Sequence, residues 1–161
     1  MNTGPGRTYR YFTGTPLYPF GWGLSYTTFN LTWASPPSMS PLANTGGSSS
    51  VYSILVTNTG TVTGDEVVLA FFSTTAVPSS DPASAIIRQL FDFQRVTLEP
   101  GQATTVSFTV DPTSTFILYD VDGNQVSYPG NYEVQFTDGV AQTLSTPVVV
   151  SGDYRIIDSF V

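Results

Sequence analysis

The sequence contains no cysteine, no histidine and no lysine. Without cysteine there is no disulfide framework and no thiol chemistry, and the redox compartment stays open. Without histidine there is no Ser-His-Asp arrangement, and without these three residue types the usual routes to an activated nucleophile or a zinc site are closed. The sequence therefore predicts no cofactor and no metal.

Positive charge is scarce too, because five arginines face twelve acidic residues and give a formal charge of −7. Such a charge repels phosphate backbones and anionic membranes at neutral pH, so neither nucleic acid nor a membrane is an expected partner. No apolar run reaches the roughly 18 to 20 residues needed to span a bilayer. The start of the chain also lacks the pattern of a signal peptide.

What the sequence does contain is a series of short apolar runs separated by glycine and proline turns. Short apolar runs, several of which alternate with polar residues, predict strands at 27–34, 51–57, 67–72, 90–96, 103–110, 116–119, 125–127, 131–136 and 143–150. We expect the second and third runs to be antiparallel neighbours. The predicted fold is an all-β, immunoglobulin-like antiparallel sandwich, of the fibronectin type III-like kind because the paired cysteines of antibody domains are absent.

Two segments stand apart from this pattern. Residues 1–26 are predicted to be an irregular arm, and residues 27–161 to be the sandwich. Within the sandwich, residues 35–50 are dominated by serine, proline, glycine and asparagine, which predicts a flexible loop on the surface.

The arm carries an unusual density of aromatic side chains for so short a segment. Prolines and glycines interrupt any helical or strand period there, and a small domain covers only part of so much apolar area. The arm therefore predicts a partner surface. The candidate contact residues are Arg7, Tyr9, Tyr11, Phe20, Trp22 and Tyr26.

The amino-acid sequence of the arm also resembles that of a known protein family. The segment Tyr18-Pro-Phe-Gly-Trp-Gly-Leu-Ser-Tyr-Thr-Thr-Phe29 looks like the signature of glycoside hydrolase family 3, where it joins the second catalytic domain to a C-terminal fibronectin type III-like domain. The lead-in Pro5-Gly-Arg-Thr-Tyr-Arg-Tyr-Phe-Thr-Gly14 is similar to the β-xylosidase branch. Trp22 departs from the pattern, which more often has tyrosine, phenylalanine or histidine there. Phrases at 56–68, 98–102 and 128–134 extend the resemblance over nearly the whole chain.

This resemblance implies a C-terminal accessory domain that stabilises the catalytic domains of an exo-acting, retaining β-xylosidase of xylan breakdown. Family members need no cofactor, and their catalytic aspartate and glutamate lie upstream of anything in this sequence. The chain alone is therefore expected to be inactive, with the missing catalytic domains as its partner and an extracellular parent. A β-glucosidase parent and a free-standing carbohydrate- or protein-binding module stay open as alternatives.

The acidic residues offer no replacement for a catalytic pair. A retaining glycosidase needs two carboxyl groups roughly 5 to 5.5 Å apart, whereas Asp65 and Glu66 are adjacent in a strand and point to opposite faces. Asp120 and Asp122 belong to an Asp-Gly turn, and Gln125 stands where a calcium loop has glycine. We predict solvation and turn formation for these four acids.

Two further roles are open at named positions. The aromatic residues of the arm pack on the sandwich and on a neighbouring domain, or alternatively border the substrate cleft and stack on an oligosaccharide. Asn30-Leu-Thr32 fits the N-glycosylation pattern, although it falls in a predicted strand.

Overall fold

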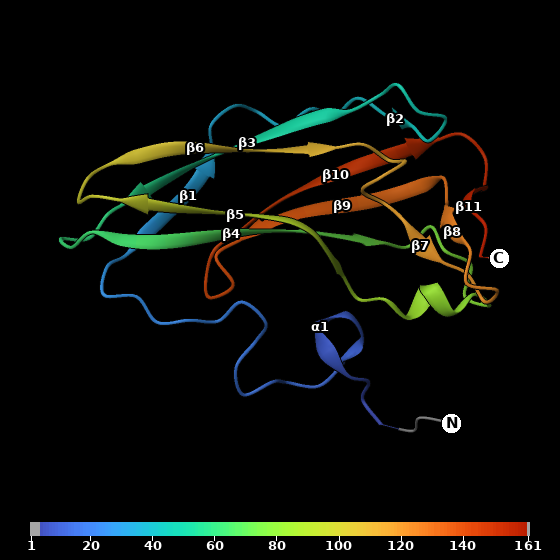
Figure 1. Ribbon diagram of the computed structural model, residues 1–161, viewed down its shortest axis with the longest axis horizontal. Helices are drawn as coiled ribbons and strands as arrows, with labels where there is room; N and C mark the ends of the chain where they lie inside the picture. The colour runs from blue at the N-terminus through green and yellow to red at the C-terminus, as the bar shows by residue number, and fades with distance from the viewer. Residues whose placement is uncertain (1–3, 161) are drawn as a thin grey trace.

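A three-stranded sheet and a five-stranded sheet lie face to face in the computed structural model, which describes residues 4–160 apart from the side chain of Pro82 (Figure 1). The first sheet has the order β1 (Phe29–Trp33), β3 (Ser50–Asn58), β6 (Ala103–Val110). The second has the order β2 (Leu42–Ala43), β10 (Thr143–Ser151), β9 (Gly130–Thr137), β4 (Gly64–Thr74), β5 (Gln89–Leu98). A small third sheet has the order β11 (Arg155–Asp158), β8 (Gln125–Ser127), β7 (Leu118–Tyr119). The predicted all-β sandwich is confirmed.

The core between the two large sheets follows from alternation along the strands. In β6, Val106, Phe108 and Val110 are buried while the residues between them are not, as the sequence pattern predicts. Phe136 of β9 occupies the middle of this core, with its ring centroid 5.1 Å from that of Phe108 and 5.7 Å from that of Tyr52. These contacts across the sheets make the sandwich a single packed unit.

Strand β4 differs because both of its faces are covered. Val68, Ala70 and Phe72 point into the core between the sheets. Leu69 and Phe71 alternate with them and are also buried, with Phe71 fully inaccessible to solvent. A strand covered on both faces reads as a continuous apolar run, which explains why residues 67–72 do not alternate.

The connection between β3 and β4 departs from the prediction. The two strands were expected to be antiparallel neighbours, but β3 pairs with β1 and β6 while β4 pairs with β5 and β9. The link therefore crosses from one sheet to the other. Asn58 holds this crossing, because its side-chain amide donates to the carbonyl oxygens of Val62 at 2.8 Å and of Leu98 at 2.9 Å.

The segment 35–50 is not a wholly free loop. Its residues Leu42 and Ala43 form β2, which pairs in parallel with the end of β10. Leu42 is 4% exposed, and Asn44 is fully buried with its Nδ2 donating to the Asp153 carbonyl at 2.8 Å. One apolar side chain and one amide therefore anchor a segment whose composition indicates a loop.

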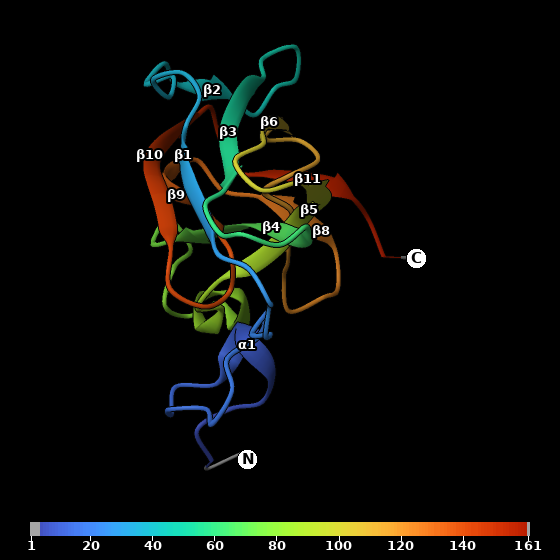
Figure 2. The same ribbon diagram turned by 90° about the vertical axis from the view of Figure 1, so that its left-hand side faces the viewer.

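Two short helical turns and strand β11 were not expected from the sequence. Helix α1 (Thr8–Tyr11) is a single turn within the arm, and a 3₁₀ turn, η1 (Pro82–Ala85), precedes β5. In Figure 2 the arm lies below the sandwich, beside the turn that leads into β5. Between residues 4 and 160 there is no helix with the length and apolar character of a membrane span.

Candidate functional site

The arm, residues 4–26, is fixed to the sandwich where β5 begins. The backbone N–H of Ile87 donates to the carbonyl oxygen of Arg10 at 2.7 Å, and the Arg10 guanidinium donates to Gln89 Oε1 at 2.8 Å. The N–H of Leu90 donates to the hydroxyl of Tyr9 at 3.2 Å. The turn of α1 presents these groups together, so one helical turn is enough to dock the arm.

Aromatic rings extend this docking along the outer face of β4. The centroid of Tyr9 lies 4.4 Å from that of Phe20 and 5.6 Å from that of Phe71. Phe20 meets Phe71 edge to face at 6.1 Å. Pairs of this kind contribute about 0.5–1.5 kcal/mol each beyond the area they bury. The arm is therefore held by a cluster of three rings, to which the sandwich contributes Phe71.

Glycines let the arm approach the sandwich closely at the next step of its course. Gly21 has φ +88°, and a Cβ atom there would overlap the side chain of Leu69. Gly139, in the turn between β9 and β10, has φ +76°, and its added Cβ would lie 2.5 Å from the Gly21 carbonyl oxygen. Both positions need glycine because the left-handed backbone and the close contact exclude a side chain.

Beyond these contacts the arm turns a second set of apolar side chains outward. We call this set the outer arm face; it consists of Leu17, Tyr18, Trp22, Leu24 and Tyr26. Leu24 is 89% exposed and Tyr26 is 99% exposed, whereas Trp22 is partly sheltered by the tilted ring of Tyr18, with the two centroids 4.5 Å apart. Large apolar side chains gathered in this way on one segment mark a contact surface rather than a finished exterior.

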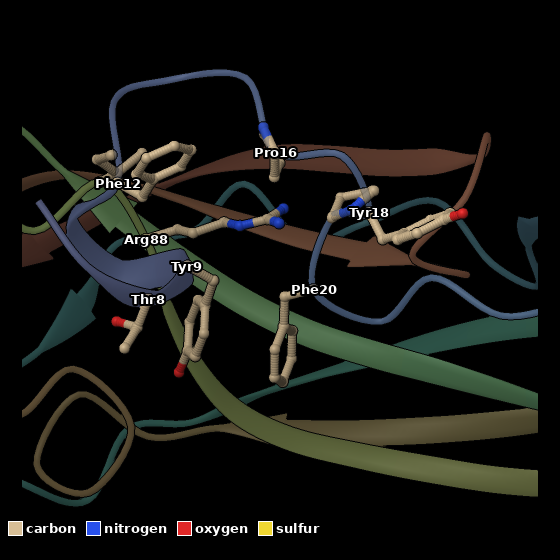
Figure 3. A pocket seen from close by; sticks show the side chains of 9 residues that line it. Thr8, Tyr9, Phe12, Pro16, Tyr18, Phe20 and Arg88 are labelled. Atoms are coloured by element: carbon tan, nitrogen blue, oxygen red, sulfur yellow. The ribbon is translucent and has the colours of Figure 1, made fainter. Parts of the chain in front are cut away.

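A cleft with a volume of about 580 Å³ lies between the arm and residues 87–88, just before β5 (Figure 3). Its walls include Tyr9, Phe12, Tyr18 and Phe20, and Arg88 extends across it. The Arg88 guanidinium carbon lies 4.3 Å from the centroid of Phe71, a cation–π contact. Burial lowers the pKa of Arg88 from its usual range, yet an arginine remains charged at neutral pH.

A second hollow, of about 240 Å³, lies where residues 21–25 meet the start of β4. Asp65 there accepts a hydrogen bond from Thr97 Oγ1 at 2.6 Å and pairs with Arg95, and these contacts hold its pKa below the usual value. Burial raises the pKa of Glu66, and the charge of Asp138 adds to that rise. Asp65 is thus committed to a surface ion pair, and the two adjacent acids have opposite shifts.

Asp120 forms the turn that its sequence predicts. Its carboxylate accepts from the backbone N–H groups of Asp122 at 3.0 Å and Asn124 at 2.9 Å, and from the Asn124 side chain at 3.0 Å. These bonds lower the pKa of Asp120, the side-chain bond from Asn124 most of all. Among residues 4–160, no three Asp, Glu, His or Cys side chains are grouped so that they would hold a metal ion.

The candidate residues therefore separate into two groups. The rings of Tyr9 and Phe20 meet Phe71 of the sandwich, although Phe20 is itself 43% exposed, while Tyr11, Trp22 and Tyr26 are exposed and make no ring contact with the described sandwich. Arg7 is exposed as well, and Asn30 is exposed on β1, an edge strand.

Sequence reasoning missed the residues on the sandwich side of this site. These are Leu69, Phe71 and Arg88. The first two carried a signal, because a run without alternation indicates a second buried face. Arg88 carried none, since nothing in its neighbouring residues indicates that a segment almost eighty positions earlier lies over it.

Comparison with known proteins agrees with this architecture. Residues 66–139 match the family model of the fibronectin type III-like domain. The chain is 40% identical over 136 residues to a beta-xylosidase of Formosa agariphila, and this alignment covers 83% of this chain and 17% of that protein. It is 35% identical over 167 residues to an exo-1,4-beta-xylosidase of Emericella nidulans, which covers 97% of this chain and 21% of that protein. The chain thus spans about a fifth of the length of the curated relatives it matches.

Solved structures give the same fold over most of the chain. A beta-glucosidase from Listeria innocua in complex with glucose superposes with a TM-score of 0.72 at 26% identity, covering 90% of this chain and 20% of that one. A β-glucosidase from Erythrobacter marinus gives a TM-score of 0.68 at 30% identity, covering 90% and 18%. Both likenesses extend beyond residues 66–139, and thus beyond the part that matches the domain family.

Proposed function

This chain is a fibronectin type III-like region of the kind found in family 3 glycoside hydrolases, and from that premise we propose that it stabilises the catalytic domains of an exo-acting β-xylosidase. Its place in that enzyme would be C-terminal to those domains. The names of the curated relatives support the xylosidase activity. The parent would hydrolyse terminal β-linked sugars, and this chain would contribute surface rather than catalytic groups.

The observation that carries this proposal is the division of the arm into two faces. The rings of Tyr9 and Phe20 contact Phe71 of the sandwich. The outer arm face, by contrast, is not covered by any of the described residues. An apolar patch of this kind on a free domain would promote aggregation. Since the matched relatives are about five times as long, the rest of such a polypeptide is the simplest cover.

A deletion in the full-length polypeptide tests the proposal. Removing the region that corresponds to residues 1–161 should lower the midpoint of thermal inactivation of aryl β-xylosidase activity. The isolated chain should release no nitrophenol from aryl β-xylosides or aryl β-glucosides. An unchanged inactivation midpoint after the deletion, or enzyme-level turnover by the chain alone, would contradict it.

A β-glucosidase parent is the second candidate, and the solved structures favour it. Those with TM-scores of 0.72 and 0.68 are β-glucosidases. The full-length enzyme distinguishes the two, because the ratio of kcat/KM on aryl β-xyloside to that on aryl β-glucoside should exceed one for a xylosidase. A ratio below one would assign the same accessory role to a β-glucosidase.

A contact with oligosaccharide at the rim of the substrate cleft is a finer proposal. Exposed aromatic faces suit the apolar faces of pyranose rings, and Tyr18 and Trp22 form an accessible pair of tilted rings in contact. Titrating the chain with xylohexaose would quench Trp22 fluorescence if this pair binds sugar, while Trp33 serves as the internal reference in the core. No change in the Trp22 emission would leave the pair with a purely protein-contact role.

An extracellular parent remains part of the proposal. The exposed position of Asn30 and Thr32 on β1 leaves the acceptor tripeptide accessible to a transferase. Mass spectrometry of the protein from its natural source would show a glycan at Asn30 if the chain passes through a secretory pathway that glycosylates.

A further inference from the structure

Arg88 is a cation without a polar partner in the cleft that it crosses. Its side chain makes no hydrogen bond and no ion pair with any other residue that the structure describes; it lies over the face of Phe71 and shares the cleft with Tyr9. Three other arginines each have a polar acceptor. Arg10 donates to Gln89, Arg95 to Asp65, and Arg155 to the carbonyl oxygen of Asn44.

The surroundings of Arg88 are largely apolar. Tyr9, Phe12, Pro16 and Phe20 line the cleft, so the guanidinium is partly removed from water while no acid replaces that hydration. The guanidinium carbon lies over the Phe71 ring, and no described residue accepts a hydrogen bond from the N–H edges of the group. The best match to those edges is a carboxylate, which accepts two parallel hydrogen bonds.

We propose that the Arg88 cleft receives an aspartate or glutamate side chain from the catalytic part of the same polypeptide. This inference rests on the proposed function, and it names the anchor of the contact. The ion pair would form at the edge of the outer arm face, since Tyr18 belongs to both surfaces. A buried, bidentate pair would fix the register in which the apolar side chains beside it meet their partner.

The lining of the cleft favours a protein side chain over a sugar. Recognition of a sugar requires several polar groups placed around its hydroxyls. Apart from Arg88, the cleft offers side-chain hydroxyls only from Thr8, Tyr9 and Tyr18, and the Tyr9 hydroxyl already accepts from Leu90. Arg88 is the one charged side chain among those that line the cleft, and most of the others are apolar. This lining matches the single carboxylate and short apolar stem of an aspartate or glutamate side chain.

The first experiment tests the chemistry of the cleft on the chain itself. Phenylacetate and its neutral counterpart phenylacetamide are titrated separately while amide chemical shifts are followed by NMR. We expect saturable shifts around residues 87–90 with phenylacetate, and at least about tenfold weaker binding of phenylacetamide, because only the carboxylate pairs with the guanidinium. Equal responses to the two probes would overturn the carboxylate assignment.

Variants define the residue responsible. Arg88→Gln should abolish the preference for phenylacetate, and Arg88→Lys should restore only part of it because an ammonium group is not planar and bidentate. Arg155→Gln makes the same change of charge at the far side of the sandwich and should leave binding unaltered. A preference for phenylacetate that survives Arg88→Gln would show that another group binds the anion.

The second experiment identifies the occupant in the full-length enzyme. Arg88→Gln should lower the midpoint of thermal inactivation by several degrees and make the arm accessible to protease, whereas Arg155→Gln should do neither. Phenylacetate should bind the isolated chain but not the intact enzyme, where the cleft is already filled. Binding to both with equal strength would overturn the proposed occupant and leave a small-molecule carboxylate site.

Failure of the inference and failure of the proposed function look different. If deletion of the whole region leaves the enzyme unchanged, the stabilising role itself is wrong. If that deletion destabilises the enzyme but Arg88→Gln does not, the role stands and the anchor is wrong.

Discussion

The two faces of β4 are both buried, yet they are covered by very different structures. The inner face, with Phe72, belongs to the core between two sheets whose strands are fixed by ladders of backbone hydrogen bonds, and the Phe72 ring meets those of Phe116 and Tyr132 there. The outer face, with Phe71, is covered by an arm that has one helical turn and a few hydrogen bonds to the start of β5. The inner contact is complete within this chain, whereas the arm continues outward into exposed apolar side chains.

This difference teaches where the chain is self-sufficient. Aromatic rings meet on both faces at similar centroid distances, such as 5.2 Å between Phe72 and Phe116 and 5.6 Å between Tyr9 and Phe71. What differs is how the covering segment is held, since the arm has one helical turn and a few hydrogen bonds while the strands have continuous ladders, and so we expect a lower free energy for opening the arm. The arm is therefore the part whose order depends most on a partner.

The largest effect on stability is expected for Phe136 of β9, in the middle of the core between the two sheets. Phe136→Ala should lower the free energy of unfolding of the isolated chain by about 4 kcal/mol, because it leaves a cavity among Trp33, Tyr52 and Phe108. Urea denaturation followed by circular dichroism measures it. Phe93→Ala, at a ring 61% exposed on β5, is the control and should stay within about 0.5 kcal/mol. Equal losses would erase the distinction between core and surface rings.

A smaller and more local effect is expected at the outer face. Phe71→Ala should cost about 2–3 kcal/mol, less than a core phenylalanine because the arm can detach without unfolding the sandwich. Hydrogen exchange should then show faster exchange of the Ile87 and Leu90 amides, which bond to the arm, and unchanged protection in β3 and β6. Faster exchange throughout both sheets would mean that arm and sandwich unfold as one unit.

The two tryptophans offer a matched comparison between arm and core. Trp22→Ala should change the stability of the isolated chain by less than about 1 kcal/mol, since the side chain is 40% exposed and its ring contact is with Tyr18 of the same arm. Trp33→Ala should cost about 3 kcal/mol because its ring packs on Tyr52 and Phe136. Thermal unfolding measures both. In the full-length enzyme the Trp22 effect should grow, and equal losses in both settings would place Trp22 in the core.

The smallest effect expected is a pH dependence at the hollow between the arm and β4. Burial raises the pKa of Glu66, so the folded state disfavours its charged form while the unfolded state does not. The resulting loss of stability is absent below the usual glutamate pKa of 4.5 and develops as pH rises through the higher folded pKa. Asp65, Asp138 and Arg95 also line the hollow.

Glu66→Gln should therefore stabilise the chain by a few tenths of a kcal/mol, up to about 1 kcal/mol, at neutral pH, because the site is only half-buried and solvent screens it. Near pH 4 the variant and the natural chain should be equally stable. Urea denaturation at the two pH values makes the comparison. A variant that is less stable at neutral pH would reverse the sign assigned to this site.

Much of the sandwich could be predicted because strand patterns are local. Alternation at Val106, Phe108 and Val110 gave the buried face of β6, and the Glu99-Pro-Gly-Gln102 turn appears with Gly101 at φ +75°. Strand β11 escaped prediction because exposed residues in it show no alternation with a buried face. The pairing of β3 and β4 was wrong because a five-residue link permits either a hairpin or a crossing between sheets.

The candidate site was predictable only in composition. Its aromatic content marked the arm as a contact segment, but the assignment of Tyr9 and Phe20 to the sandwich and of Trp22 and Tyr26 to the exterior needed the folded chain. A segment without a regular period has no face that can be inferred from spacing.

The sequence by itself determined an all-β sandwich, an arm with more apolar area than so small a domain can bury, and a family resemblance. The tertiary structure alone decided which rings face inward, which strands share a sheet, and that Arg88 has no polar partner among the described residues. The physical reason is one of range. Alternation and turn chemistry act between neighbouring residues. The hydrogen bond that docks the arm joins Tyr9 to Leu90, which are 81 positions apart and come together only in the packed chain.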